Sequence, residues 1–318
     1  MKNHKYYYVI FGSGWDLYKQ SYSDLNKVDD AIYISDEIIR RNVLRRFHLG
    51  KVNNYVDLPL KGLWNGCYFK NPFPEDRELC FVFFRNWLEL DKQVGLISYL
   101  KLNYPGAKFV FFLQDLFNNY SYPIEIFDMV LSFDQGDCEK YGFIYHPLVF
   151  SYYHGGQEDL PCSDVYFLGQ AKDRLEEILS VYEFLRNKGL KCDFHITNVL
   201  PEKQRYIDEI DYNSLFSYEK NLQHVLHSKC VLEIMQHGGL GMTQRAVEIV
   251  GLDKMLLPNN ARIKEAPFYN PECICQFSSL SDINDSFIEK IKMGVKIKYD
   301  YKKNLSPLNL LDFIDERL

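Results

Sequence analysis

The feature that most constrains the fold of this chain is a glycine-rich turn that leads directly into a helix, within residues 237–248. An apolar run at residues 230–234 precedes the turn, and a second apolar run at residues 254–260 follows the helix. A strand, a glycine turn, a helix and another strand form one unit of a parallel α/β sheet. Because the first N–H groups of a helix have no partner within it and carry positive dipole character, this turn predicts an anion-binding site.

Apolar runs of strand length alternate with helix-like periodicity along the whole chain, which is typical of parallel sheets covered by helices. Strands are expected at residues 5–11, 31–34, 79–84, 108–113, 129–133, 143–147, 164–168, 191–197, 230–234 and 254–257. Helices are expected at residues 36–49, 93–103, 137–141, 174–188, 218–227, 284–293 and 307–317.

The periodicity is lost at residues 151–163, which contain two glycines, a proline and an acidic pair and therefore read as a linker. The predicted fold class is α/β, with two Rossmann-like, doubly wound domains that face a cleft. We place the first domain at residues 1–154 and the second at residues 155–300. The remaining residues, 301–318, predict a C-terminal helix that could pack back on the first domain.

Composition narrows the class of protein. The chain has 318 residues, of which 47% are hydrophobic, so a globular protein is expected. The net charge of −6 argues against nucleic acid as a partner, which needs a positive field. Eight cysteines without framework spacing indicate free thiols in a reducing cytosol. No signal peptide and no apolar stretch of membrane-spanning length is recognisable, so a cytoplasmic location is expected.

A basic cluster lies on the expected helix at residues 36–49. Its four members are Arg40, Arg41, Arg45 and Arg46. They could hold an acceptor pyrophosphate or anionic lipid head groups, which would place the protein peripherally at the inner face of the membrane. A solvated basic face explains the same residues, and the pattern slightly favours that interpretation.

Two loops of the second domain carry the residue types that a diphosphate needs. In the first loop, Gly169 lets a ligand come close to the backbone, and the positive charges of Lys172 and Arg174 can offset the negative charge of phosphate groups. The second loop combines glycines with a hydroxyl, a cation and a neighbouring histidine. These residues are His237, Gly239, Gly241, Thr243 and Arg245. His237 could donate to a phosphate oxygen, although a lone histidine in a turn usually has no such role.

Glu248 follows Arg245 by three residues on the same helix. A carboxylate there can accept the two hydroxyls of a ribose, which predicts a nucleotide diphosphate site. The alternative is that the glycines only allow a tight turn and that Glu248 only pairs with Arg245 along the helix. The residues alone leave the two interpretations nearly even.

Residues 164–277 resemble the nucleotide-sugar domain of GT-B glycosyltransferases, in particular bacterial lipopolysaccharide and capsular polysaccharide transferases with a Gly-Leu-Thr-Arg-like signature. The matching stretches are residues 164–169, 218–222, 231–234, 239–245, 248, 254–260 and 268–271. The first half of the chain matches only in layout. The resemblance implies that Glu248 holds the ribose of a nucleotide-sugar donor. It also implies that Gly169, Lys172, Arg174, Thr243 and Arg245 hold the diphosphate, and that no cofactor is needed.

The chain departs from the retaining pattern of two glutamates about eight residues apart, because the residue eight before Glu248 is Leu240. Whether the reaction inverts or retains configuration is therefore left open. The sequence contains no Asp-x-Asp pair, which a metal-dependent transferase of the other major fold uses to hold a cation. We accordingly predict that the site has no metal ligands, that transfer needs no obligatory metal ion, and that helix dipoles and basic side chains stabilise the leaving group.

An inverting enzyme would need a general base on the acceptor side. Asp16 and Asp115 are the leading candidates because each lies near the end of an expected strand, and Asp134 and His146 have similar positions. Each alone is more often a helix cap or a surface group. The turn at residues 12–14 has a Gly-x-Gly pattern without a third glycine, so it fits a plain strand-to-helix turn as well as a ligand loop.

These observations predict an enzyme, a glycosyltransferase that moves a sugar from a nucleotide diphosphate sugar to a surface-glycan acceptor, either a polysaccharide or a lipid-linked glycan. The first alternative is a nucleotide-sugar epimerase with the same two-domain plan. The second is a degenerate transferase that binds a glycan or a partner protein without catalysis.

Overall fold

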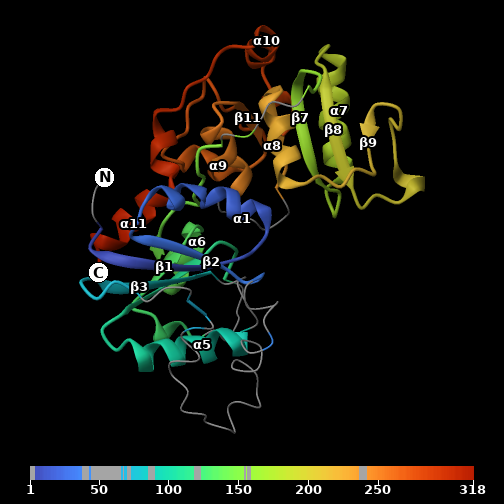
Figure 1. The fold of residues 1–318 in the computed structure, drawn as a ribbon. Helices are drawn as coiled ribbons and strands as arrows, with labels where there is room; N and C mark the ends of the chain where they lie inside the picture. The colour runs from blue at the N-terminus through green and yellow to red at the C-terminus, as the bar shows by residue number, and fades with distance from the viewer. Residues whose placement is uncertain are drawn as a thin grey trace. The chain divides into compact units, whose positions relative to one another are not determined.

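The computed structural model describes residues 4–37, 43, 66, 68–69, 73–84, 90–117, 123–153, 155, 159–235 and 242–318. The chain divides into two compact units (Figure 1). Unit 1 comprises Met1–Ser151 and Ser306–Leu318, and unit 2 comprises Tyr152–Leu305. The sequence suggested boundaries after residues 154 and 300, whereas the structure divides the chain after Ser151 and after Leu305.

Unit 1 is built on a parallel sheet, which in the described part of the chain has six strands in the order β2-β1-β3-β4-β5-β6. The strands are β1 (Tyr6–Gly12), β2 (Ala31–Ser35), β3 (Glu78–Phe84), β4 (Lys108–Leu113), β5 (Met129–Ser132) and β6 (Ile144–Tyr145). The central strands are apolar on both faces because helices cover both sides of a sheet of this kind. Phe11 of β1 stacks on Phe83 of β3 with ring centroids 4.7 Å apart, and both rings are fully buried in the core of this unit.

The described helical segments of unit 1 include the C-terminal helix. They are α1 (Asp16–Ser21), η1 (Ser23–Lys27), α5 (Leu90–Asn103), η3 (Ile124–Ile126), α6 (Gln135–Tyr141) and α11 (Pro307–Asp315). The hydroxyl of Tyr8 in β1 donates to Leu311 O at 3.0 Å and to Asp315 Oδ1 at 2.6 Å. These bonds join the last helix to the first strand, so the chain returns to unit 1 after unit 2 is complete (Figure 1).

Unit 2 is built on a second parallel sheet, described as five strands in the order β11-β10-β7-β8-β9. The strands are β7 (Ser163–Gln170), β8 (Cys192–Thr197), β9 (Ile210–Asp211), β10 (Ser228–Glu233) and β11 (Met255–Pro258). The helical segments are α7 (Leu175–Asn187), η4 (Pro201–Lys203), α8 (Tyr218–Leu226), α9 (Gln244–Gly251), η5 (Ala261–Glu265), η6 (Leu280–Asp282), α10 (Asp285–Met293) and η7 (Asp300–Leu305).

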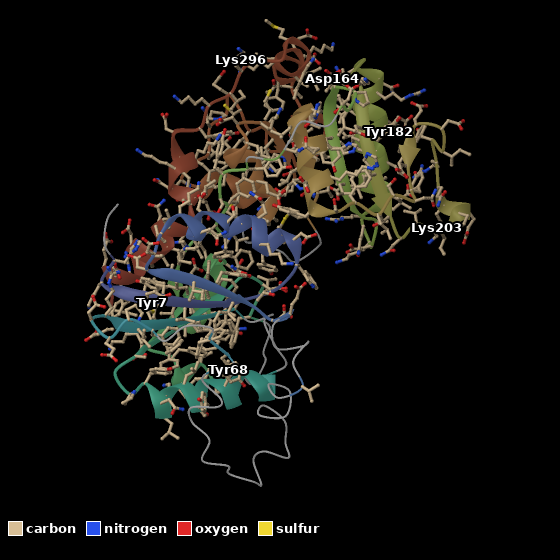
Figure 2. All side chains as sticks on the ribbon, in the orientation of Figure 1. Tyr7, Tyr68, Asp164, Tyr182, Lys203 and Lys296 are labelled. Carbon is tan, nitrogen blue, oxygen red and sulfur yellow. The ribbon has the colours of Figure 1, made fainter. Side chains whose placement is uncertain are left out.

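Helices cover both faces of the unit 2 sheet. Apolar side chains of α7 and α10 pack with Phe167 and Phe194 in one core. Tyr182, which projects from α7 (Figure 2), meets the Phe194 ring edge-on, and the ring centroids are 5.1 Å apart. The other face is covered by α8, where the His224 ring stacks on Tyr166 of β7 at 5.4 Å. Successive strand residues point to opposite faces, so the alternation along β7 and β8 determines which side chains reach α8.

The structure contains a strand or helix at every described position where the sequence predicted one, with ends that differ by a few residues. Strand β9 was not predicted, because two residues carry no periodic pattern. The expected helix at residues 36–49, with Arg40, Arg41, Arg45 and Arg46, lies almost entirely outside the described residues. In the described part of the chain, no helix combines the length and apolar character needed to span a membrane.

The Gly-x-Gly turn after β1 is explained by packing. A Cβ atom on Gly12 would lie 2.1 Å from the hydroxyl of Tyr33, and the same hydroxyl donates to Ser13 O at 2.8 Å. A side chain at position 12 would therefore displace the Tyr33 ring. The turn needs its first glycine for this ring, and no ligand is required to explain the pattern.

Candidate functional site

The candidate site lies at the carboxyl edge of the unit 2 sheet, where parallel α/β sheets bind their ligands. Strand β10 ends there at Glu233, and α9 begins after Thr243, whose side chain accepts a hydrogen bond from Ala246 N. The intervening turn contains three predicted site residues, His237, Gly239 and Gly241, which lie outside the described residues. The side chains of the residues on either side of this turn, up to Met235 and from Met242, lie within the described part of the chain.

Glu248 is the fifth residue of α9 and is only 3% exposed. The hydroxyl of Tyr218, at the start of α8, donates to Glu248 Oε1 at 2.7 Å. Burial raises the pKa of this carboxyl group, while the nearby Arg245 and the Tyr218 hydrogen bond act in the opposite direction. The structure thus holds a carboxylate in a fixed orientation, one helical turn from the turn that begins α9.

Arg245 connects this glutamate to the neighbouring strand. Its Nη2 donates to Leu168 O of β7 at 3.1 Å, and its Nε lies 3.9 Å from Glu248 Oε2. Its Nη1 is buried and has no hydrogen-bond partner among the described residues. A buried guanidinium nitrogen without a partner is costly, so it is suited to receive an anionic ligand.

Glu233 is a further residue of the site, which the sequence patterns did not indicate. It is 5% exposed, and the Thr243 hydroxyl donates to its Oε1. Its Oε2 is buried without a partner in the described structure, and burial raises the pKa of the group against the opposing effects of Thr243, Arg245 and Arg174. The only signal in the sequence was a carboxylate within an apolar strand, which local patterning does not distinguish from a surface residue.

The loop after β7 contributes the remaining predicted residues. Arg174 donates from Nη1 to Ile234 O, and from Nε and Nη2 to Gln170 O at 3.3 and 3.2 Å. A Cβ atom on Gly169 would lie 3.3 Å from Arg174 Nη2, so the glycine gives this side chain its space. Because Gln170 ends β7 and Ile234 follows β10, Arg174 links the ends of these two strands. Lys172, in the same loop, is exposed and has a left-handed backbone with φ of 46°.

The structure brings Gly169, Arg174, Thr243, Arg245 and Glu248 to one edge of one sheet, with Lys172 in the same loop as Gly169. Thr243 uses its single hydroxyl proton on Glu233, so it can donate to a phosphate only by giving up that bond.

The candidate bases all belong to unit 1. Asp16 begins α1 and Asp115 follows β4, and both are exposed. Asp134 is buried as the cap of α6, where it accepts from Asp137 N at 2.9 Å. Burial lowers the pKa of His146 to about 4, so this ring is neutral and only weakly basic at neutral pH.

Raising the pH from about 4.5 should destabilise unit 2 through Glu233 and Glu248. The pKa of both groups is raised by burial, so the folded state holds their protons more tightly than the unfolded chain does. Their contribution to the free energy of unfolding is complete below the ordinary glutamate pKa and is lost as the pH rises through the folded pKa. Urea unfolding followed by circular dichroism, from pH 4.5 to 8, measures the effect.

The variant Glu233→Gln keeps the shape of the side chain but cannot titrate, so its unfolding free energy should fall less with pH than that of the wild type. Glu202→Gln changes an exposed residue in η4 and serves as the matched control. Identical pH profiles for the wild type and Glu233→Gln would contradict the assignment.

No family model matches the chain, and no curated protein matches it in sequence. Among solved structures, the chain is similar to UDP-GlcNAc 2-epimerase from Neisseria meningitidis bound to UDP-GlcNAc, with a TM-score of 0.50 and 11% identity, over 98% of this chain and 99% of that chain. A Listeria monocytogenes protein assigned as a UDP-N-acetylglucosamine 2-epimerase gives the same TM-score and identity, over 99% of this chain and 97% of that chain. An alpha-glucosyltransferase in complex with UDP-glucose and DNA has a TM-score of 0.49 and 12% identity, over 97% and 92%. The chain thus has the GT-B architecture, an α/β fold with two Rossmann-like units.

Proposed function

We propose that this chain is a glycosyltransferase that transfers a sugar from a nucleotide diphosphate sugar to a surface-glycan acceptor, a polysaccharide or a lipid-linked glycan. The observation that carries the proposal is the buried Glu248, held by Tyr218 and next to Arg245 at the carboxyl edge of the unit 2 sheet. A carboxylate would repel a diphosphate, but it suits the hydroxyl groups of the adjacent ribose. Its neighbour Arg245 suits the diphosphate.

In this proposal, Glu248 accepts hydrogen bonds from the ribose, and the unpartnered Nη1 of Arg245 donates to the diphosphate. The start of α9 adds backbone N–H groups and positive dipole character. The proposal also assigns the diphosphate to Gly169, Lys172, Arg174 and Thr243, and to Gly239, Gly241 and His237 of the turn. The solved epimerase with the same fold binds UDP-GlcNAc, which supports a nucleotide sugar as the ligand of this architecture.

In this proposal, the general base that activates the acceptor comes from unit 1, the acceptor-binding domain. Asp16 and Asp115 are the proposed bases if the reaction inverts configuration, because both are exposed near the ends of unit 1 strands. We propose a cytoplasmic protein that reaches a membrane-bound acceptor through Arg40, Arg41, Arg45 and Arg46, with no nucleic acid partner. The donor is the substrate, and neither a cofactor nor a metal ion is required for transfer.

A nucleotide-sugar 2-epimerase is the second candidate function, and the comparisons specifically favour it. Two solved structures with TM-scores of 0.50 carry that activity in their names, and the similarity covers nearly the whole chain. The product of an epimerase is an intact nucleotide sugar in which one sugar carbon is inverted. A transferase must instead release the nucleoside diphosphate, so the products distinguish the two functions.

The first experiment is a thermal-shift screen of nucleoside diphosphates and their sugars. The ligand that fits should raise the melting temperature with its concentration, by mass action on the folded state. Incubation with that nucleotide sugar, followed by proton NMR, should then show release of the nucleoside diphosphate, fastest with a glycan acceptor. An intact nucleotide sugar with one inverted carbon would identify an epimerase instead.

Binding without any change in the sugar would favour the non-catalytic module, and a flat thermal response across the panel would reject the donor site. Transfer should continue in EDTA. Loss of transfer in EDTA with recovery by manganese, but not by zinc, would contradict the metal-independent mechanism.

A further inference from the structure

A second cluster of ionisable side chains lies in unit 2, between the sheet and α8, outside the proposed donor site. Asp193 and His195 come from β8, and His224 comes from α8. One potential ligand atom from each of the three residues lies within 4.8 Å of the other two. The alternation along β8 places Asp193 and His195 on the face opposite Phe194, which belongs to the core under α7.

The two imidazole rings converge on one carboxylate. His195 Nε2 lies 2.8 Å from Asp193 Oδ1, and His224 Nδ1 lies 2.7 Å from Asp193 Oδ2. The other nitrogen of His195, Nδ1, lies 3.2 Å from Asp211 Oδ2 of β9. One nitrogen atom from each histidine therefore converges on the Asp193 carboxylate. The Asp211 carboxylate contacts the other nitrogen of the His195 ring.

His195 has a carboxylate against each of its ring nitrogens. A neutral imidazole carries one N–H, so it can donate to only one of these carboxylates. The second contact needs a positive species between ring and carboxylate, either another proton or a metal ion. When a histidine binds a metal through one nitrogen, its other N–H commonly donates to a carboxylate, and Asp211 occupies that position.

We propose that Asp193, His195 and His224 form a binding site for a divalent transition-metal ion, with zinc as the best match. Two imidazole nitrogens and one carboxylate oxygen are ligands that zinc accepts, and water can fill a fourth position. The ion takes the place of the hydrogen-bond protons between Asp193 and the two rings: the proton displaced from His195 Nε2 passes to solvent, and the proton displaced from His224 Nδ1 moves to His224 Nε2, which has no partner in the described structure. His195 Nε2 and His224 Nδ1 become ligands, and His195 Nδ1–H donates to Asp211.

The surroundings of the cluster hold the proposed ligands in place. Asp211 accepts hydrogen bonds from the Ser214 hydroxyl, from Asn213 N at 2.9 Å and from Ser214 N at 3.1 Å. The Phe216 ring stacks on His224 at 4.7 Å and lies 4.5 Å from the His195 ring. Aromatic packing restricts both imidazoles, and backbone donors orient the supporting carboxylate. A metal site needs this kind of support around its ligands.

The proposed ion has a structural role and takes no part in the transfer step. It would tie α8 to β8 through His224, and the same helix carries Tyr218, which donates to Glu248. The ion contacts neither residue of the donor site: Glu248 is bonded to Tyr218 and lies next to Arg245, and Arg245 donates to Leu168 O. This site therefore does not depend on the proposed transfer activity, and its occupancy can be measured without any nucleotide sugar.

The test uses the full chain stripped of metal by a chelator and then titrated with zinc chloride and cobalt chloride. We expect one equivalent of zinc by calorimetry and a visible absorption band from bound Co²⁺ that zinc displaces. The melting temperature should rise by about 5–10 °C when free zinc exceeds its Kd a hundredfold. His224→Gln should lose the Co²⁺ band and the zinc-dependent rise.

Two variants complete the experiment. His227→Gln is the matched control, because His227 caps the same helix and bonds to Gln223 O at 2.8 Å outside the cluster. It should bind zinc like the wild type. Asp211→Asn retains all three ligands and should weaken zinc binding by about 10–100-fold. The proposal is overturned if the stripped wild type binds no zinc, or if His224→Gln and His227→Gln bind it equally. The cluster would then be a hydrogen-bonded His–Asp network.

Discussion

Replacing Glu248 with glutamine should weaken binding of the nucleotide sugar by about 10–100-fold while the protein remains folded. A hydrogen bond to a charged group contributes about 1.5–3 kcal/mol, and each 1.4 kcal/mol is a tenfold change in Kd. The glutamine amide matches the glutamate in shape and can still accept the hydrogen bond from Tyr218. It offers a ribose one neutral acceptor in place of a charged carboxylate. Isothermal titration with the nucleotide sugar measures the change.

The controls separate the ribose contact from general damage to the site. Glu219→Gln changes an exposed glutamate next to Tyr218 on α8 and should leave the Kd unchanged. Tyr218→Phe keeps the carboxylate but removes the hydroxyl that orients it, so it should weaken binding less than Glu248→Gln does. If Glu248→Gln binds the ligand as tightly as the wild type, Glu248 does not hold the ribose.

Replacing Arg245 with alanine should weaken binding of the nucleoside diphosphate by roughly a hundredfold and should also destabilise unit 2. The arginine donates to Leu168 O, and its Nη1 has no partner in the described part of the chain. Charge-assisted hydrogen bonds to a phosphate are about twice as strong as neutral ones. Removing the guanidinium also takes away the cation that opposes the raised pKa of Glu248, and one of the two cations, with Arg174, that oppose the raised pKa of Glu233, so both pKa values should rise further.

The ligand series shows which part of the nucleotide each residue contacts. The nucleoside alone should bind to Arg245→Ala and to the wild type equally, whereas the diphosphate should lose its advantage in the variant. Arg245→Lys keeps the charge without the planar fork, so it should fall between the two. Arg186→Ala removes an exposed arginine paired with Glu209 and is the control. If Arg245→Ala prefers the nucleoside diphosphate over the nucleoside as strongly as the wild type does, Arg245 does not bind the diphosphate.

Local patterns in the sequence predicted most of the unit 2 elements. Strands such as β10 and β11 are short apolar runs, and the helix between them follows a glycine turn. The three-residue spacing of Arg245 and Glu248 on α9 was also sufficient to bring the two side chains together, at 3.9 Å. These features depend on residues that are close in the sequence, where backbone geometry determines distance.

The partners of these residues could not be predicted in the same way. Tyr218 lies thirty residues before Glu248, and Arg174 lies sixty residues before Ile234, whose carbonyl it contacts. Such contacts depend on the strand order β11-β10-β7-β8-β9, which places β7 beside β10. Apolar runs identify strands, but they do not specify which strands are neighbours.

The residues alone were enough to predict an α/β chain in which α9 follows a glycine-rich turn and carries Arg245 and Glu248 three residues apart. The folded structure was needed to show that Glu233 is a buried carboxylate at the same edge of the sheet, and that Asp193, His195 and His224 meet between β8 and α8. The physical reason is that helix and strand periods are local properties of the backbone. The meeting of side chains from separate elements depends on how the whole sheet is ordered and covered.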